Sequence, residues 1–214
     1  CRYDHVETDL NTWHFYLNSY EIVRDHIRKV VEETYPGSSF NFIGENRQTD
    51  APLMNSECGM VWGVDGSAGD LAWQYHYMLN EYRLHEKLCG FVFTEFHDVV
   101  NEFNGYYRID NTDKDFGYQD FCRGMSLCDL HAADFLAVDC PPMQTVAPGA
   151  AVAVPLVLSS FSDAHHGETC SVEWELWHDG LQGRVCDGQG AFALPEFGWG
   201  TTSLPALTVT MPQE

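Results

Sequence analysis

The sequence predicts an α/β region over residues 1–134 and an all-β region over residues 135–214. Three observations predict this division. Strand and helix patterns alternate in the first region, polar residues stand where its strands end, and apolar residues recur with a period of two in the second region. The chain has 214 residues, of which 44% are hydrophobic, so it is long enough for one large domain or two modest ones.

The first region has the order strand, helix, strand, helix, strand. The strands are expected at residues 8–16, 52–57 and 89–96, and the helices at residues 20–35 and 71–87. This order is typical of parallel strands joined by crossover helices. The carboxyl ends of all three strands should therefore meet at one edge of a sheet.

Polar and aromatic side chains stand at those predicted strand ends: His14, Tyr16, Ser56, Glu57, Thr94, Glu95 and His97. Active-site groups occupy this edge in a (β/α)8 barrel. A complete barrel needs about 250 residues, and the first region offers roughly half of that number. The first region is therefore expected to be the C-terminal part of a (β/α)8 TIM barrel.

The second region consists of short strands without a helical pattern. Apolar and polar residues alternate over residues 150–159, 170–177 and 204–211, and turn residues separate these stretches. Such spacing is typical of an immunoglobulin-like β-sandwich, which needs about 100 residues. Residues 135–214 are fewer than that. The sandwich is therefore expected to be incomplete, with its last strands past Glu214.

The charge of the chain argues against several classes of partner. Lys and Arg total 11 against 32 Asp and Glu, which gives a formal net charge of -21. Nucleic acid and anionic membrane surfaces both attract basic proteins, so neither partner is expected. No apolar run has the length of a membrane-spanning helix, so membrane insertion is not expected either. A secreted or periplasmic location is favoured over a cytoplasmic one.

The 8 cysteines leave two interpretations open. None belongs to a Cys-x-x-Cys pair, which argues against a zinc-ribbon or thioredoxin site. We predict no metal site and no cofactor. Disulfides between Cys122 and Cys128 and between Cys140 and Cys170 are plausible, and buried free thiols are an equally plausible alternative.

Three segments carry short motifs at the predicted strands, namely Asp9-Leu-Asn-Thr-Trp-His-Phe-Tyr16, Pro52-Leu-Met-Asn-Ser-Glu-Cys-Gly59 and Gly90-Phe-Val-Phe-Thr-Glu-Phe96. Together they resemble consecutive barrel strands of glycoside hydrolase family 2, which includes β-galactosidases, β-mannosidases and β-glucuronidases. The first resembles the sixth strand of that barrel. The second resembles the nucleophile strand, although Cys58 replaces the usual aromatic residue. The third resembles the eighth strand, with Phe93 at the place of a tryptophan that lies under the sugar.

The segment after these strands resembles the same family. Asn104-Gly105, followed by the stretch from Asp110 to Lys114, is similar to the exit from the family's barrel. An immunoglobulin-like sandwich also follows the barrel in this family. The resemblance therefore covers nearly the whole chain through the order and spacing of short motifs.

The resemblance implies a retaining β-glycosidase that acts on a carbohydrate substrate. Glu57 takes the place of the nucleophile. Tyr16 and His14 are the other catalytic candidates, because they could donate hydrogen bonds to the ionised Glu57 from the neighbouring strand. A retaining enzyme also needs a second carboxyl group about 5–5.5 Å away, which serves as acid and base. The acidic chain favours a neutral sugar such as galactose or mannose.

Four further residues are candidates for substrate binding: Glu95, His97, Trp62 and Phe93. Aromatic rings can stack on sugars, and polar groups can bind sugar hydroxyls. Packing is the alternative role of the two aromatic residues. A structural pair is the alternative for Glu95 and His97.

The acid/base residue of the family is the glutamate of an Asn-Glu pair that ends the fourth barrel strand. Asn80-Glu81 lies within a predicted helix and Asn101-Glu102 follows the eighth strand, so neither pair fits. The acid/base is therefore expected upstream of Cys1. The isolated chain is expected to be inactive without the remainder of the enzyme or other subunits. Two other interpretations stay open: a non-catalytic carbohydrate-binding or scaffold fragment, and another family of retaining barrel glycosidases.

Overall fold

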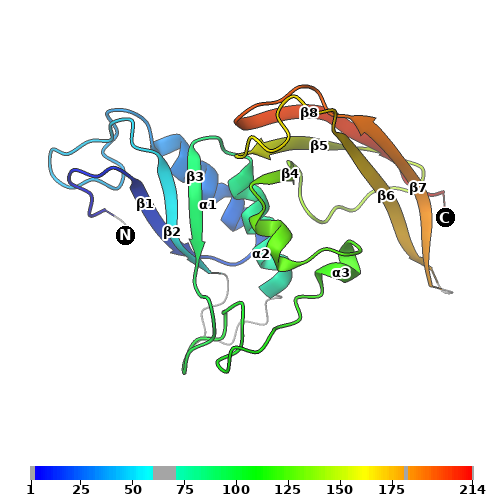
Figure 1. Ribbon diagram of the computed structural model, residues 1–214, viewed down its shortest axis with the longest axis horizontal. Helices are drawn as coiled ribbons and strands as arrows, with labels where there is room; N and C mark the ends of the chain where they lie inside the picture. Colours follow the sequence, from blue (N-terminus) through cyan, green and yellow to red (C-terminus); the bar gives the residue numbers. More distant parts are fainter. Residues whose placement is uncertain (1–2, 60–70, 181–182, 214) are drawn as a thin grey trace. The chain divides into compact units, whose positions relative to one another are not determined.

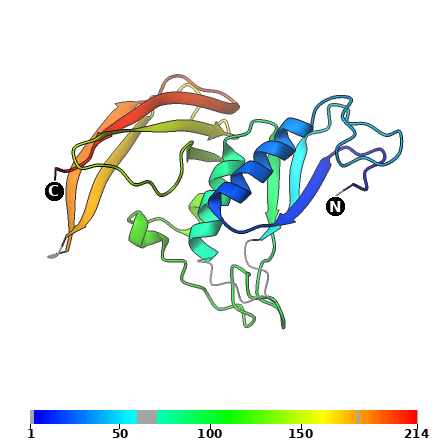
Figure 2. The same ribbon diagram turned by 180° about the vertical axis from the view of Figure 1, so that it is seen from behind.

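The computed structural model describes residues 3–59, 71–180 and 183–213, and the chain divides into two compact units. Cys1–His131 form the first unit and Ala132–Glu214 form the second. Figure 1 labels the strands and α-helices of both units, and Figure 2 shows them from behind. All the candidate site residues within the described ranges belong to the first unit.

The first unit is built on a three-stranded parallel sheet. Its strands are β1 (Asn11–Tyr16), β2 (Leu53–Gly59) and β3 (Leu88–Phe93), and β2 lies in the middle. Helix α1 (Tyr20–Glu33) lies between β1 and β2 in the sequence, and α2 (Leu71–Arg83) precedes β3. The prediction of parallel strands with crossover helices is confirmed.

Both helices pack on one face of this sheet. Trp13 and Phe15 of β1 point to that face, where Tyr82 of α2 meets their rings at centroid distances of 6.2 and 6.4 Å. His26 of α1 lies 4.5 Å from the ring of Phe15. The apolar residues of α1 that enter this core recur at helical spacing: Val23, Ile27 and Val30. The helical period therefore predicts the buried face of α1 correctly.

An ion pair between the partly exposed Arg28 and the buried Glu81 joins α1 to α2. Glu81 is 1% exposed and accepts hydrogen bonds from Arg28 Nε at 2.7 Å and from His85 Nε2 at 3.0 Å. The loss of either partner would leave a buried carboxylate less well compensated, which is costly. The interpretation of Asn80-Glu81 as a helical segment is confirmed, because both residues lie inside α2.

A long segment with little regular structure follows β3. It contains the short helix α3 (Tyr118–Phe121) and the 3₁₀ helix η1 (Leu127–His131). The backbone N–H of Tyr106 donates to the carbonyl of Glu95 at 3.1 Å, and that of Tyr107 donates to the carbonyl of Phe96 at 3.1 Å. The chain therefore folds back on itself beside the residues that follow β3.

The predicted fold class is wrong. Most elements are strands, and helices make up about 17% of the chain. A small β-rich structure of this kind does not fit a portion of a (β/α)8 TIM barrel, whose strands are each followed by a full helix. The strand–helix–strand pattern misled the prediction because open parallel sheets share it with barrels. None of the helices in the described ranges has the length and apolar character needed to cross a membrane.

The second unit is all-β, as the period of two predicts, and its described strands form two antiparallel sheets. One antiparallel sheet contains β4 (Asp134–Val138), β5 (Ala151–Ser160) and β8 (Gly200–Thr210). A second sheet pairs β6 (Ser171–Gly180) with β7 (Gly183–Ala193). These described strands are fewer than the seven or so of an immunoglobulin domain. The buried centre of the unit contains three leucines: Leu156, Leu158 and Leu204.

The sequence pattern does not predict β7, because its glycines indicate turns. In the structure, Gly188 and Gly190 lie beneath the indole ring of Trp174 in the paired strand β6. A Cβ at Gly190 would lie 2.8 Å from Nε1 of that indole. The glycines of β7 therefore make room for a large side chain instead of ending the strand.

The described cysteines are free thiols. Neither plausible disulfide forms, because Cys122, Cys128, Cys140 and Cys170 are all unpaired with sulfur. Cys58 is the fully buried member of the described set, and burial raises its pKa to about 12. Since the thiolate is the reactive form, reaction with alkylating reagents is expected at the exposed cysteines instead.

The buried tyrosines predict a loss of stability at alkaline pH. Tyr75 and Tyr82 are 0% and 3% exposed, and burial raises the pKa of both far above the ordinary value. In the unfolded chain both would ionise near pH ~10, so above that pH the folded state binds more protons. The stability they contribute is therefore complete below about pH 10 and falls as the pH rises further. The slope is up to about 1.4 kcal/mol per pH unit for each tyrosine.

Urea unfolding between about pH 8 and pH 11 measures this slope. The double variant Tyr75→Phe/Tyr82→Phe should show a flatter decline than the unsubstituted protein. Tyr35→Phe is the matched control, because Tyr35 is 55% exposed. An unfolding free energy that stays constant across this range would contradict the prediction.

Candidate active site

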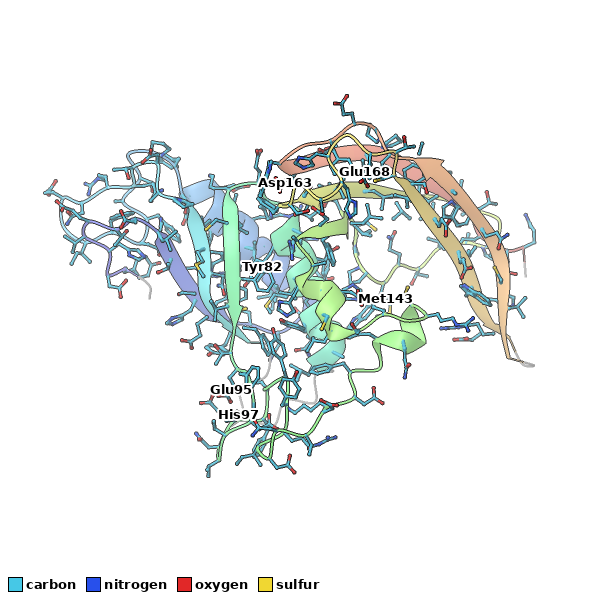
Figure 3. The ribbon with its side chains drawn as sticks, viewed as in Figure 1. Tyr82, Glu95, His97, Met143, Asp163 and Glu168 are labelled. Carbon is cyan, nitrogen blue, oxygen red and sulfur yellow. The ribbon has the colours of Figure 1, made fainter. Side chains whose placement is uncertain are left out.

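The candidate site lies at the carboxyl edge of the parallel sheet, the edge at which open α/β sheets bind their ligands. Tyr16 ends β1, and Glu57 lies two residues before the end of β2. β3 ends at Phe93, and Glu95 and His97 lie just beyond its carboxyl end (Figure 3). The strand predicted at residues 89–96 is therefore too long, and these two candidates belong to the following loop.

A one-residue irregularity in β2 determines which way Glu57 points. Trp13 pairs with Asn55, but the next residue of β1, His14, pairs with Glu57. Ser56 is therefore an extra residue, as in a β-bulge. In a regular ladder Glu57 would face the helices, whereas the extra residue turns it to the opposite face. The hydroxyl of Ser56 donates to the carbonyl of Trp13 at 3.2 Å, which anchors the irregularity.

The hydroxyl of Tyr16 donates a hydrogen bond to Oε1 of Glu57. Burial first, and then this hydrogen bond, raise the pKa of Tyr16 well above its ordinary value. A hydrogen bond with Thr94 opposes the rise, and the charge of Glu102 adds to it. The phenol therefore keeps its proton at neutral pH and remains a donor. Such a donor stabilises the ionised carboxylate and fixes its orientation, which a carboxylate nucleophile needs.

Gly59 allows the ring of Tyr16 to lie against β2. A Cβ at Gly59 would lie 2.8 Å from Cε1 of Tyr16 and 3.2 Å from Nδ2 of Asn104. Asn104 is 2% exposed, and its side-chain amide donates to the carbonyl of Thr94. The bare backbone of Gly59 therefore leaves the space in which the ring of Tyr16 lies beside Glu57, and the buried amide of Asn104 lies beside the same glycine.

Carboxyl groups gather in the loop after β3. Burial first, and then the charges of Glu102 and Asp98, raise the pKa of Glu95. Oε1 of Glu95 is buried and has no hydrogen-bond partner within the described ranges. Asp98 is compensated, because Lys114 Nζ donates to its Oδ1 at 2.6 Å. Glu95 is therefore the acid of this loop whose side chain has an unsatisfied acceptor.

The structure brings three predicted catalytic candidates together, namely His14, Tyr16 and Glu57. His14 and Tyr16 share one face of β1, as the sequence predicts. Nδ1 of His14 is buried and unpaired in the part of the chain that the structure describes. His97 is held differently, because its Nδ1 donates to the carbonyl of Asp98 at 2.8 Å. It forms no hydrogen bond with Glu95 that would make the two a structural pair.

The two aromatic candidates for sugar stacking have different outcomes. Phe93 is 8% exposed, and its ring lies 4.7 Å from that of Tyr106 and 4.3 Å from that of Tyr75. Packing, the alternative that the sequence left open, describes its surroundings. Trp62 lies outside the described residues.

Three residues of this site were not predicted from the sequence: Gly59, Asn104 and Glu102. Gly59 and Asn104 belong to segments with a family resemblance, but no pattern in the sequence indicates that Gly59 lies beside Tyr16 or that Asn104 lies beside Gly59. The sequence offers Glu102 only as a member of an Asn-Glu pair that does not fit the acid/base position. The pairing of Tyr16 with Gly59 in the β1–β2 register identifies the role of the glycine, and this register is known only from the structure.

Comparisons of the chain with protein-family models and with curated proteins found no match. No group of three His, Cys, Asp or Glu side chains in the described ranges could hold a metal ion. The interpretation of the site therefore depends on its geometry and on the chemistry of its residues.

Proposed function

We propose that Glu57 is the nucleophile of a retaining β-glycosidase. The observation that supports this proposal most directly is the hydrogen bond from Tyr16 to Glu57 at the carboxyl edge of a parallel sheet. An ordinary surface glutamate is solvated and free to rotate. Glu57 is half-buried and oriented by a phenol that keeps its proton, so it has the properties of a carboxylate prepared for attack.

The proposed reaction has two steps. The carboxylate of Glu57 attacks the anomeric carbon, the glycosidic C–O bond breaks, and an acid protonates the leaving oxygen. Water then attacks the same carbon, gives its proton to the conjugate base of that acid, and displaces Glu57. Two inversions give net retention of configuration. Tyr16 keeps its proton in both steps and orients the oxygen that it contacts.

The acid and base of this reaction is proposed to be an Asn-Glu glutamate upstream of Cys1. Of the two Asn-Glu pairs in the chain, Glu81 lies inside α2 and is paired with Arg28. Glu102 lies in the loop after β3, where its charge acts on Tyr16. Neither ends a strand of the sheet. We therefore propose that activity requires the remainder of the same enzyme or another subunit.

A neutral sugar is the proposed substrate because few positively charged side chains balance the negative charges of the acids at the site. Glu57 and Glu95 lie at the sheet edge. The neighbouring loop contains Arg108, whose Nη1 donates to the carbonyl of Asp113, and Lys114. The ammonium of Lys114 already donates to Asp98 and to the carbonyl of Phe103 at 2.9 Å. A sugar carboxylate would therefore meet like charges, and both of these cations already donate to protein oxygens.

Covalent trapping in the full-length protein tests the role of Glu57. A 2-deoxy-2-fluoro-β-glycoside with a dinitrophenolate leaving group forms the glycosyl-enzyme without protonation, and the fluorine slows hydrolysis of the intermediate. We expect a mass increase of one fluoroglycosyl group, mapped to Glu57. Glu57→Gln should remain unlabelled, whereas Glu86→Gln, which changes an exposed acid, should be labelled normally. No label, or a label on another residue, would overturn the proposal.

A further inference from the structure

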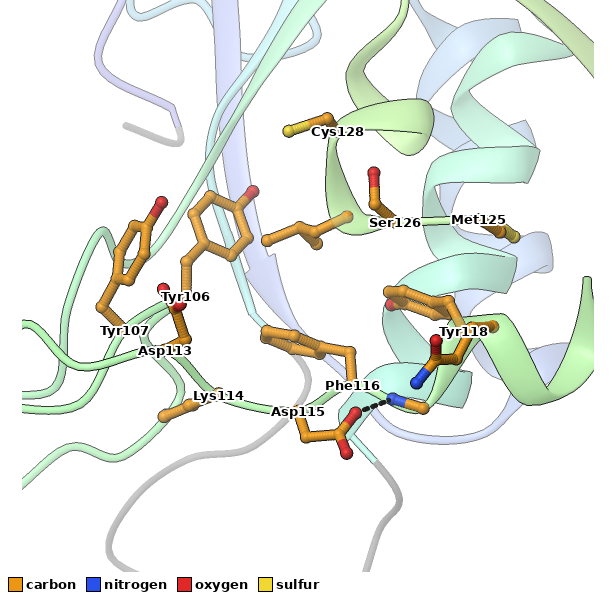
Figure 4. A pocket seen from close by; sticks show the side chains of 13 residues that line it. Tyr106, Tyr107, Asp113, Lys114, Asp115, Phe116, Tyr118, Met125, Ser126 and Cys128 are labelled. Atoms are coloured by element: carbon orange, nitrogen blue, oxygen red, sulfur yellow. Dashed lines mark hydrogen bonds between the residues drawn. The ribbon is translucent and has the colours of Figure 1, made fainter. Parts of the chain in front are cut away.

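A cavity of about 320 Å3 lies in the long segment that follows β3 (Figure 4). It is lined by residues between Tyr106 and Cys128, and all of them belong to the first unit. This volume is at the lower end of the range of small-molecule sites. None of the residues assigned above to catalysis lines it.

One wall of the cavity is aromatic and held in place. The rings of Phe116 and Tyr118 are nearly parallel, with an angle of 4° and a centroid distance of 5.8 Å. Tyr118 is 3% exposed, and its hydroxyl donates to the carbonyl of Ala72 in α2 at 2.8 Å. Phe116 is half-buried, so part of its ring remains accessible.

A second aromatic anchor, Tyr106, lies across the lining. Its ring stacks on Phe93 at a centroid distance of 4.7 Å and an angle of 17°. Its hydroxyl lies 2.9 Å from Nε2 of His131, within hydrogen-bond distance. Because Phe93 ends β3, this side of the cavity is attached to the sheet. The aromatic lining is therefore ordered before any ligand binds, which lowers the entropic cost of binding.

The lining of the cavity includes two carboxylates. Asp113 and Asp115 both line the cavity and are exposed. Oδ1 of Asp115 accepts the backbone N–H of Gly117 at 2.8 Å, which orients this carboxylate and leaves its second oxygen for another donor. Lys114 also belongs to the lining, but its ammonium is bonded to Asp98. The cavity therefore presents oriented acceptors and disfavours anionic ligands.

We propose that this cavity binds a neutral saccharide. Sugars combine apolar C–H faces, which pack on aromatic rings, with hydroxyl donors, which bind carboxylates. In the proposed complex, a sugar ring packs against Phe116, and its hydroxyl groups donate to Asp113 and Asp115. The site is separate from the proposed nucleophile, so it would bind saccharide whether or not Glu57 forms a covalent intermediate.

A cysteine pair in the same segment provides a local test. Cys128 lines the cavity and Cys122 does not, and both thiols are exposed and free. The protein with Glu57→Gln, which prevents turnover, is treated with iodoacetamide in the presence of lactose, cellobiose or mannobiose. Peptide mass spectrometry measures alkylation at each thiol. We expect at least one disaccharide to slow alkylation of Cys128 several-fold while the rate at Cys122 stays unchanged.

Two variants make the test specific. Phe116→Ala should raise the saccharide concentration needed for half-maximal protection of Cys128 by about tenfold. This change corresponds to the loss of one stacking contact. Phe103→Ala is the matched control, because Phe103 is 60% exposed and its side chain does not line the cavity. Equal protection in these two variants would overturn the proposal.

A comparison of different ligands shows whether the cavity prefers a neutral sugar to a charged ligand. Aromatic rings and carboxylates can also bind an organic cation, so choline is tested beside the disaccharides and glucuronate. Protection by choline or glucuronate but by no neutral sugar would overturn the proposal, as would protection by none of these ligands. Covalent labelling of Glu57 tests the proposed function and protection of Cys128 tests the cavity, so either result can fail independently of the other.

Discussion

Tyr16→Phe is expected to slow the covalent labelling of Glu57 by about 10- to 100-fold. The substitution removes the hydroxyl that donates to Oε1 of Glu57 and keeps the ring. A hydrogen bond to a charged group contributes about 1.5–3 kcal/mol, and each 1.36 kcal/mol corresponds to a factor of ten. The carboxylate would lose both stabilisation of its charge and its fixed orientation, so the substituted protein should attack the anomeric carbon more slowly.

The measurement is the rate of mass increase with the activated 2-fluoro glycoside. Tyr35→Phe should react at the unsubstituted rate, since Tyr35 is 55% exposed and takes no part in the site. The pKa of Tyr16 lies well above its ordinary value, so Tyr16 ionisation should not reduce the rate between about pH 8 and pH 10. A Tyr16→Phe protein that is labelled as fast as the control would show that this hydrogen bond does not assist Glu57.

The sequence predicts the local architecture of the first unit well because the spacing of its apolar residues indicates which positions are buried. Val23, Ile27 and Val30 repeat at helical spacing, and Trp13 and Phe15 alternate along β1. The order of elements then implies parallel strands. The order of elements does not show whether further strands pair with the outer edges of β1 and β3. That pairing distinguishes a barrel from other parallel sheets. The error in fold class arose at that step.

The orientation of Glu57 could not be predicted for a related reason. Nothing in the run from Asn55 to Glu57 indicates that Ser56 is an extra residue, because the irregularity exists only in the pairing with β1. The sequence placed Glu57 near Tyr16 because both residues end adjacent strands. The single inserted residue then brings them to one face, and a regular ladder would have separated them.

The supporting residues of the site come from contacts between distant segments. Asn104 donates to the carbonyl of Thr94 from a loop that returns to the sheet edge after β3. Its amide and the ring of Tyr16 both lie beside Gly59. Predicting that return would require the backbone pairing between Glu95 and Tyr106, which has no periodic signal. No sequence pattern indicates the role of a glycine such as Gly59 either, because that role is to leave space for a neighbouring side chain.

Gly59→Ala should therefore slow labelling of Glu57 by about 100-fold, the effect expected when a reacting group is displaced by about 1 Å. The new Cβ would lie 2.8 Å from Cε1 and 3.1 Å from Cδ1 of Tyr16, so the ring must move. Nδ2 of Asn104 would lie 3.2 Å from the same Cβ, which limits how far the new methyl group could shift away from the ring. Gly90→Ala is the matched control, since Gly90 lies in β3 of the same sheet and a Cβ there would meet no atom within 4 Å.

The double variant Tyr16→Phe/Gly59→Ala shows whether the glycine acts through the tyrosine. If Gly59 only makes room for a hydrogen-bonding ring, the two losses share one cause, and the double variant should react about as slowly as the slower single variant. Circular dichroism and urea unfolding check that each variant is folded. A Gly59→Ala protein as reactive as Gly90→Ala would show that the ring position is unimportant. Losses that multiply would show instead that Gly59 acts on Glu57 by a route other than Tyr16.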